Sequence, residues 1–65
     1  MIQLTQLGGK NFWINPHLIE YIETTPDTTL TLTSGKHVIV REKVDAVIDA
    51  IIAYRRKLGL FGNEE

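Results

Sequence analysis

Side chains that could carry catalytic or metal chemistry are few in this 65-residue sequence and lie far from one another. A metal site needs several ligands at defined spacing, but His17 and His37 are isolated and no cysteine is present. We expect both histidines to lie on the surface. Ser34 has no neighbouring base that would activate it as a nucleophile. These residues predict no catalytic residue, no metal ligand and no cofactor site, so an enzyme is not expected.

Two further groups of residues have side chains suited to acid–base catalysis or phosphate binding, but they lack the structural context that these functions need. Glu20, Glu23 and Asp27 could supply a carboxylate pair, but acid–base catalysis needs a cleft that gives the two groups different environments. A domain of this size rarely builds such a cleft, so a solvated acidic face is the better interpretation. Gly8-Gly9-Lys10 lacks the strand-to-helix context of a phosphate-binding loop and predicts a hairpin turn instead.

Composition narrows the classes of partner. Seven basic and eight acidic residues give a net charge of −1, which disfavours binding to nucleic acid or to an anionic membrane. No apolar run reaches the roughly 20 residues of a transmembrane helix, and the first residues lack the layout of a signal peptide. We therefore expect a cytoplasmic protein. One small core without disulfides favours stabilisation by self-association, so a homo-oligomer is also expected.

The strongest local pattern is an amphipathic helix over residues 42–58. Acidic residues come early in this segment and basic residues come late, as the helix dipole favours. Its large apolar side chains recur at helical spacing and cover an arc of roughly 160°, wider than one sheet requires: Val44, Val47, Ile48, Ile51, Ile52, Tyr54 and Leu58. Ala46, Ala50 and Ala53 extend this arc. They form either a flank for a second surface or simply favourable helix formers.

The preceding residues predict five short strands separated by turns. The strands are expected at residues 1–7, 11–14, 19–25, 28–33 and 37–41, because apolar and polar residues alternate there. Asn15-Pro16 predicts a short helical turn between the second and third strands, since Asn caps a helix and Pro suits its first position. The fold class is therefore α+β. We expect a small antiparallel five-stranded twisted sheet or partial roll with one C-terminal amphipathic helix, over residues 1–58, followed by a tail at 59–65.

Alternation predicts that six strand residues face inward: Phe12, Ile14, Leu30, Leu32, Val38 and Val40. It also predicts which large side chains face outward. Trp13 and Ile39 fall on the outer side of their strands, and Trp13 is either covered by its own chain or part of a partner interface. Leu60 and Phe61 are apolar residues in the tail, which either folds back, stays loose or docks onto another protein. The candidate protein interface comprises Trp13, Tyr21, Ile39, Ala46, Ala50, Ala53, Leu60 and Phe61.

The ordered combination of residues up to about Tyr54 resembles the FlbD family of small bacterial flagellar proteins. The opening MI-x-LT-x-L-x-G pattern is matched by Met1-Ile2, Leu4-Thr5, Leu7 and Gly9, and the doubled Ile-Glu by Ile19-Glu20 and Ile22-Glu23. The PDT-x-x-x-L-x-x-G-K segment is matched by Pro26-Asp27-Thr28, Leu32 and Gly35-Lys36, and is followed by Val40 and Glu42. Gly8 departs from the asparagine usual there, although both residues suit a turn with positive φ.

This resemblance implies a non-enzymatic, cytoplasmic flagellar accessory protein that supports the flagellar motor and swarming motility. SwrD-like members of the family support the torque of swarming motors, which implies contact with a flagellar motor or stator component. A small regulatory nucleic-acid-binding module is the alternative, because small β-rich domains also bind DNA or RNA. The net charge and the absence of basic residues interleaved with aromatic residues on one strand stand against it.

Overall fold

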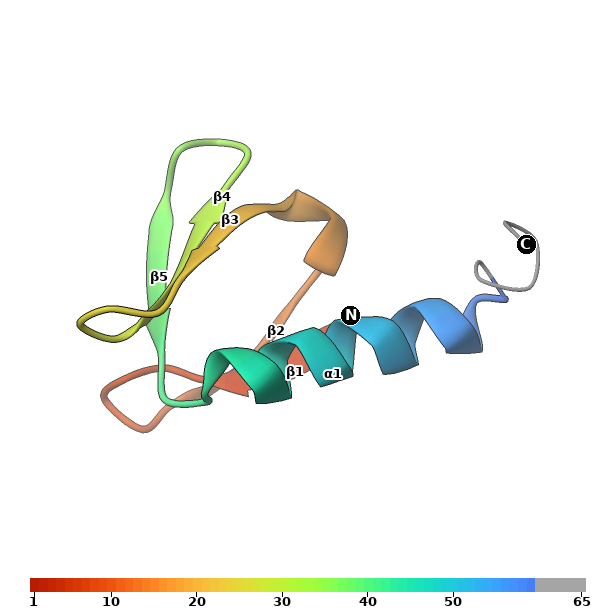
Figure 1. Cartoon of the computed structure of the whole chain (residues 1–65), viewed down its shortest axis with the longest axis horizontal. Coiled ribbons are helices and arrows are strands. Elements are labelled where there is room, and N and C mark those ends of the chain that lie inside the picture. Colours follow the sequence, from red (N-terminus) through yellow and green to blue (C-terminus); the bar gives the residue numbers. More distant parts are fainter. Residues whose placement is uncertain (60–65) are drawn as a thin grey trace.

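A computed structural model describes residues 1–59, and within them it contains five strands, a short 3-10 turn and one helix (Figure 1). The elements in chain order are β1 (Ile2–Thr5), β2 (Asn11–Ile14), η1 (Pro16–Leu18), β3 (Ile19–Glu23), β4 (Thr28–Leu32), β5 (His37–Val40) and α1 (Val44–Lys57). The predicted strands, helical turn and helix are all present. Most lie within the predicted ranges and are shorter by one to three residues at their ends.

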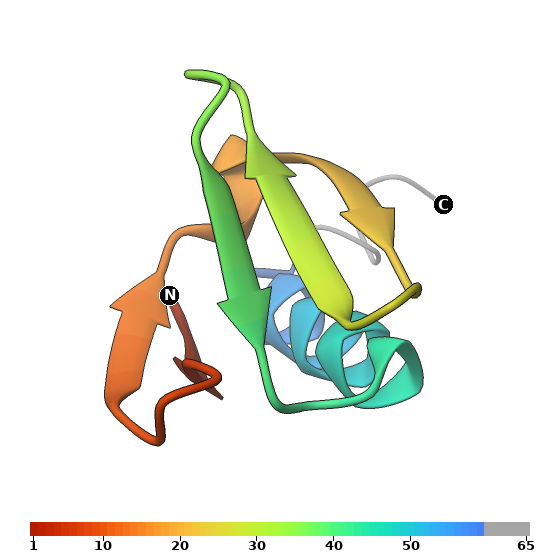
Figure 2. The ribbon, with the colours of Figure 1, turned by 90° about the vertical axis from the view of Figure 1, so that its left-hand side faces the viewer.

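The strands form two antiparallel sheets, which corrects the prediction of one five-stranded sheet. β1 pairs with β2, and β4 lies between β3 and β5 (Figure 2). Among residues 1–59, the strand pairing between the two sheets is limited to an isolated bridge between Gln6 and Val40. The physical reason is the early hairpin turn. The chain leaves β1 at Gly8 and Gly9, so too few residues remain beside β5 to extend the pairing.

The corner between the sheets is held by backbone hydrogen bonds. The Leu7 amide donates to the Ile39 carbonyl at 3.1 Å, and the Arg41 amide donates to the Thr5 carbonyl at 2.8 Å. These bonds run along the edge of β5 that faces away from β4. The structure is therefore a three-stranded sheet with a two-stranded hairpin attached at one corner.

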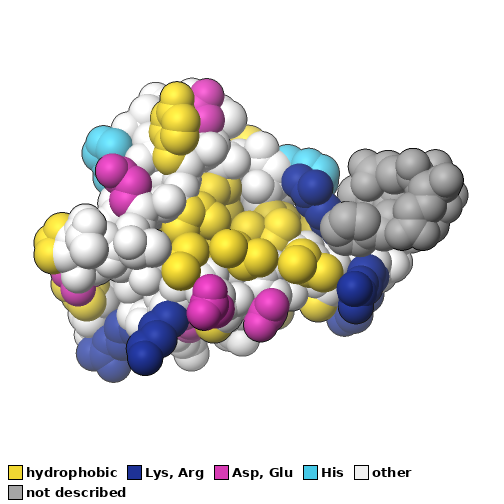
Figure 3. All heavy atoms as spheres, in the orientation of Figure 1, with side chains coloured by type: hydrophobic (Ala, Val, Ile, Leu, Met, Phe, Trp, Pro, Cys, Tyr) yellow, Lys and Arg dark blue, Asp and Glu magenta, His cyan; other side chains and the backbone are white. Residues whose placement is uncertain are grey.

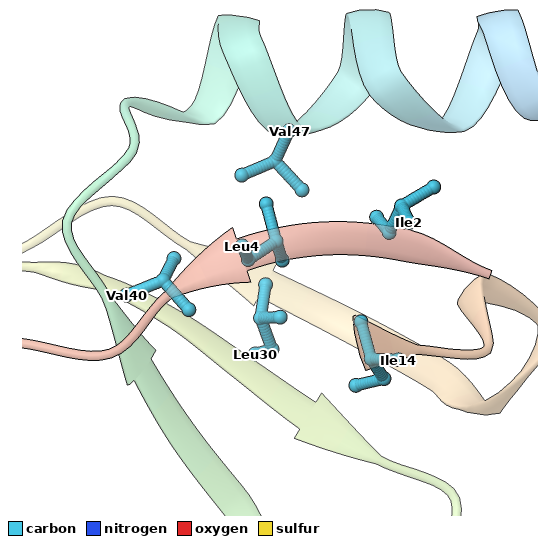
Figure 4. Close-up of a cluster of buried hydrophobic side chains, with 6 residues drawn as sticks. All are labelled: Ile2, Leu4, Ile14, Leu30, Val40 and Val47. Carbon is cyan, nitrogen blue, oxygen red and sulfur yellow. The ribbon is translucent and has the colours of Figure 1, made fainter. Parts of the chain in front are cut away.

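Six apolar side chains form the buried core: Ile2, Leu4, Ile14, Leu30, Val40 and Val47. They come from both sheets and from α1, and they point toward one another (Figure 4). The inward positions predicted by alternation are correct, since Phe12, Leu32 and Val38 pack against this cluster. Full burial of each such side chain contributes about 1.5–3 kcal/mol. Six residues make a small core.

The local sequence explains the ends of η1 and α1. The Asn15 side chain accepts a hydrogen bond from the His17 amide at 3.0 Å, as expected of a capping residue. α1 begins at Val44 and not at residue 42, because the Glu42 side chain bonds to β1. The helix ends at Lys57, Leu58 is its C-cap residue, and Gly59 follows with a φ of +74°, which suits glycine.

Much of the surface of α1 is left uncovered by the strands. Only Val47 of α1 is fully buried, and the second half of the helix extends beyond the strands (Figure 1).

In the β1–β2 turn, Gly9 has a φ of +104°, whereas Gly8 does not adopt positive φ. The predicted hairpin turn at Gly8-Gly9-Lys10 is therefore present, and of the two glycines Gly9 supplies the positive φ.

Candidate protein interface

Trp13 lies on the outer face of the β1–β2 hairpin. It stands opposite Gln3 in the strand pairing, between the inward side chains of Phe12 and Ile14. Its side chain is 63% exposed, so residues 1–59 leave most of the indole uncovered. The prediction that Trp13 points away from the core is correct. Coverage by the tail beyond residue 59 lies outside the described residues.

Trp13 lines a groove between the hairpin and β5. Leu7 and Ile39, 49% and 41% exposed, also line it, together with Lys36 and His37. The apolar floor comes from Phe12, Ile14, Leu32 and Val38, and the groove has a volume of about 580 Å³. We call this site the Trp13 groove. It brings together two of the predicted interface residues, Trp13 and Ile39, which are distant in the sequence.

Leu7 belongs to this site but is absent from the predicted interface. The signal was available, because alternation from Ile2 and Leu4 places the odd-numbered residues of the first strand outside. What alternation cannot show is that this outer side faces β5. That relationship depends on the corner between the two sheets.

One backbone edge of β5 opens onto the groove. Ile39 and Arg41 direct their backbone groups toward β1, and in an antiparallel strand every second residue directs its groups to the same edge. The amide and carbonyl of His37 therefore point to this edge too, past the place where β1 turns away at Gly8. An added strand from a partner would find both apolar side chains and backbone hydrogen-bonding groups here.

The charge of the groove is neutral to basic. Lys36 and His37 are its ionisable lining residues, and no acidic residue lines it. The His37 Nδ1 atom lies 3.0 Å from the Thr31 hydroxyl oxygen, which fixes the imidazole on the outer face of the sheet. An acidic side chain at one end of a bound segment would find a favourable partner in Lys36.

Tyr21 does not join the Trp13 groove. It is 61% exposed and lines a separate hollow on the three-stranded sheet with Glu20, Glu23 and Thr31. The strand register places Tyr21, Thr31 and His37 in one row across β3, β4 and β5. His37 contributes to both hollows and separates Tyr21 from the groove.

The three predicted alanines divide between two environments on α1. Ala46 and Ala53 are exposed, whereas Ala50 packs against the core cluster. Ile48 is 43% exposed and is a larger apolar surface that the candidate list omits. The width of the apolar arc was the signal for it, since a single sheet cannot cover so wide a face. Leu60 and Phe61 lie outside the described residues.

The Glu42 carboxylate lies at the corner where β1 meets the segment that leads into α1. Its Oε1 atom accepts a hydrogen bond from the Thr5 amide at 3.0 Å. Burial alone would raise the pKa of this carboxyl, but hydrogen bonds from the Thr5 amide and from its own amide lower the pKa below its ordinary value. The carboxylate is therefore ionised at neutral pH, and its hydrogen bond to the Thr5 amide connects the segment before α1 to β1.

The residues considered for chemistry are dispersed in the structure. His17, in η1, contacts Tyr54 edge to face, with ring centroids 6.1 Å apart. His37 lies in β5 and contacts Thr31. Among residues 1–59, no three His, Asp or Glu side chains gather as metal ligands would. Within the same residues, no helix has the length and hydropathy needed to cross a bilayer.

Comparison with known families identifies the chain. No curated protein and no solved structure matches it. A family model described as FlbD, flagellar and swarming motility proteins, matches residues 1–59, which is nearly the whole sequence and the whole described fold. This extent agrees with the resemblance seen in the order of its short motifs. The chain therefore belongs to the FlbD family of flagellar and swarming motility proteins.

Proposed function

We propose that this protein is a non-enzymatic, cytoplasmic accessory protein that supports the flagellar motor and swarming motility by binding a motor or stator component through the Trp13 groove. Membership of a family of flagellar and swarming motility proteins supports a role in motility. The observation that carries the proposed site is the 63% exposure of Trp13 beside Leu7 and Ile39. Exposed aromatic residues flanked by apolar residues are typical centres of protein interfaces.

The expected mode of contact is addition of an extended partner segment to β5. The open edge at His37 offers backbone hydrogen bonds, and the floor formed by Phe12, Leu32 and Val38 accepts apolar side chains. Lys36 favours an acidic residue in the same segment. This mode requires no rearrangement of the core, because the groove is already open.

Swarming of a strain that carries Trp13→Ala in place of the natural protein tests the proposal. We expect slower expansion on swarm plates and slower rotation of tethered cells, with normal protein abundance by immunoblot. Tyr21→Ala is the matched control, because Tyr21 is equally exposed but lines a different hollow. Normal swarming of the Trp13→Ala strain would overturn the proposed site, and equal loss from Tyr21→Ala would move the contact to the outer face of the three-stranded sheet.

A further inference from the structure

A stripe of four residues on α1 faces away from the core and has an unusual symmetry. Asp45, Ile48, Ile52 and Arg55 are spaced three, four and three residues apart, which places them on one side of a helix. The order of types is acidic, apolar, apolar, basic. Read from the other end, the spacing is unchanged and the charges are exchanged. Such a stripe is complementary to itself when a second copy lies antiparallel to it.

The structure leaves this stripe available. Ile48 is 43% exposed, Asp45 is exposed, and Ile52 and Arg55 are half-buried. Hydrophobic side chains form a continuous band over α1 in Figure 3, with acidic side chains along its first half and basic side chains near its far end. Among the described residues, the buried Nε atom of Arg55 has no hydrogen-bond partner. An apolar centre therefore lies on one face of α1, with an exposed acidic residue at one end and a half-buried arginine at the other.

We propose that two copies of this chain associate through an antiparallel pairing of α1, in which Ile48 packs on Ile52 of the second copy and Asp45 lies beside Arg55 of the second copy. A two-fold axis near the middle of the helix generates both contacts twice. This surface is separate from the Trp13 groove, so the dimer leaves the groove free for another protein.

Charge decides the orientation of the pair. A parallel arrangement would place Asp45 against Asp45 and Arg55 against Arg55, and like charges at close range oppose association. The antiparallel arrangement replaces both repulsions with attractions. Because four side chains per copy are few beside the roughly 20–30 residues per side of a stable complex, we expect a weak dimer with a dissociation constant on the order of 100 μM.

Sedimentation equilibrium of the full chain from about 10 μM to 1 mM measures this association. We expect the wild-type mass to rise from monomer to dimer over this range. Ile48→Asp should raise the dissociation constant at least about tenfold, because it introduces two buried charges per dimer. Ala46→Asp is the matched control: it adds the same charge to another side of α1, and we expect no change.

An exchange of charges tests the antiparallel geometry directly. Asp45→Arg and Arg55→Glu should each raise the dissociation constant about tenfold, because each turns two attractive pairs into repulsive ones. The double variant restores opposite charges at both ends and should return to within about threefold of the wild type. Circular dichroism establishes that each variant keeps its helix, so recovery in the double variant cannot come from refolding.

The outcomes separate this proposal from the proposed function. A wild-type protein that remains monomeric up to about 1 mM overturns the dimer and leaves the Trp13 groove proposal intact. Dissociation by Ala46→Asp but not by Ile48→Asp also overturns it, because the contact would then use the alanine flank. Failure of the double variant to recover overturns the antiparallel pairing. Trp13→Ala should dimerise like the wild type.

Discussion

Glu42 and Thr5 lie 37 positions apart in the sequence, and the Thr5 amide donates a hydrogen bond of 3.0 Å to the Glu42 carboxylate. Arg41 bonds to β1 and to the turn that follows it, since its amide donates to the Thr5 carbonyl at 2.8 Å and its Nε donates to the Leu7 carbonyl at 3.0 Å. Two consecutive residues before α1 thus occupy the edge of β1. They join the hairpin, β5 and the helix at one corner.

The first prediction concerns the Glu42 side chain. Glu42→Ala leaves the partly buried Thr5 amide without its acceptor, and the free energy of unfolding should fall by about 1–2 kcal/mol. Urea denaturation followed by circular dichroism measures the change. Glu23→Ala removes an exposed carboxylate at the end of β3 and should change the stability by less than about 0.5 kcal/mol. Equal effects of the two substitutions would contradict a structural role for Glu42.

A second prediction follows from the pKa of Glu42, which is lowered in the folded protein from its ordinary value of 4.5. An acid with a lowered folded pKa adds stability above its unfolded pKa and loses it as the pH falls through the folded value. The difference in unfolding free energy between wild type and Glu42→Gln should therefore be constant above about pH 6 and shrink below the ordinary pKa. Denaturation at a series of pH values measures it. A difference that stays the same down to pH 3 would show that the carboxylate charge contributes nothing.

The third prediction uses two adjacent glycines. Gly9 has a φ of +104°, and an added Cβ would lie 3.4 Å from Nη2 of Arg41, whereas Gly8 has open space around it and lacks positive φ. Gly9→Ala should cost about 1–3 kcal/mol of unfolding free energy, because an L side chain strains this conformation. Gly8→Ala should change it by about 0.5 kcal/mol or less. Similar losses of unfolding free energy from both variants would contradict this prediction, because the positive φ of Gly9 would then not be the cause of the loss.

Sequence alternation predicted the fold well wherever one strand face is buried. It placed Leu30 and Val40 in the core and Trp13 and Ile39 outside it, because these orientations depend only on neighbouring residues. It could not show that Trp13 and Ile39 face a common groove, since that depends on how the two sheets separate at Gly8.

The roles of two side chains in and before α1 could not be predicted from local pattern. Glu42 resembles an acidic residue in the first turn of a helix, which a sequence cannot distinguish from one that reaches back to an earlier strand. Ile48 belongs to an apolar arc too wide for one sheet to cover, but which part of that arc stays exposed depends on how α1 lies on the strands. The two proposed interfaces therefore depend on tertiary geometry more than on local pattern.

The last prediction separates a binding residue from a core residue. Trp13 is 63% exposed, so Trp13→Ala should lower the free energy of unfolding by about 1 kcal/mol or less, whereas Leu4→Ala, at 2% exposure, should lower it by about 2–5 kcal/mol. Trp13 is the single tryptophan, so circular dichroism must follow the unfolding of both variants. A large loss of stability in Trp13→Ala would make Trp13 a structural residue. A stable Trp13→Ala protein that fails to support swarming would instead show that the exposed indole contributes to binding, because its removal would have left the fold unchanged.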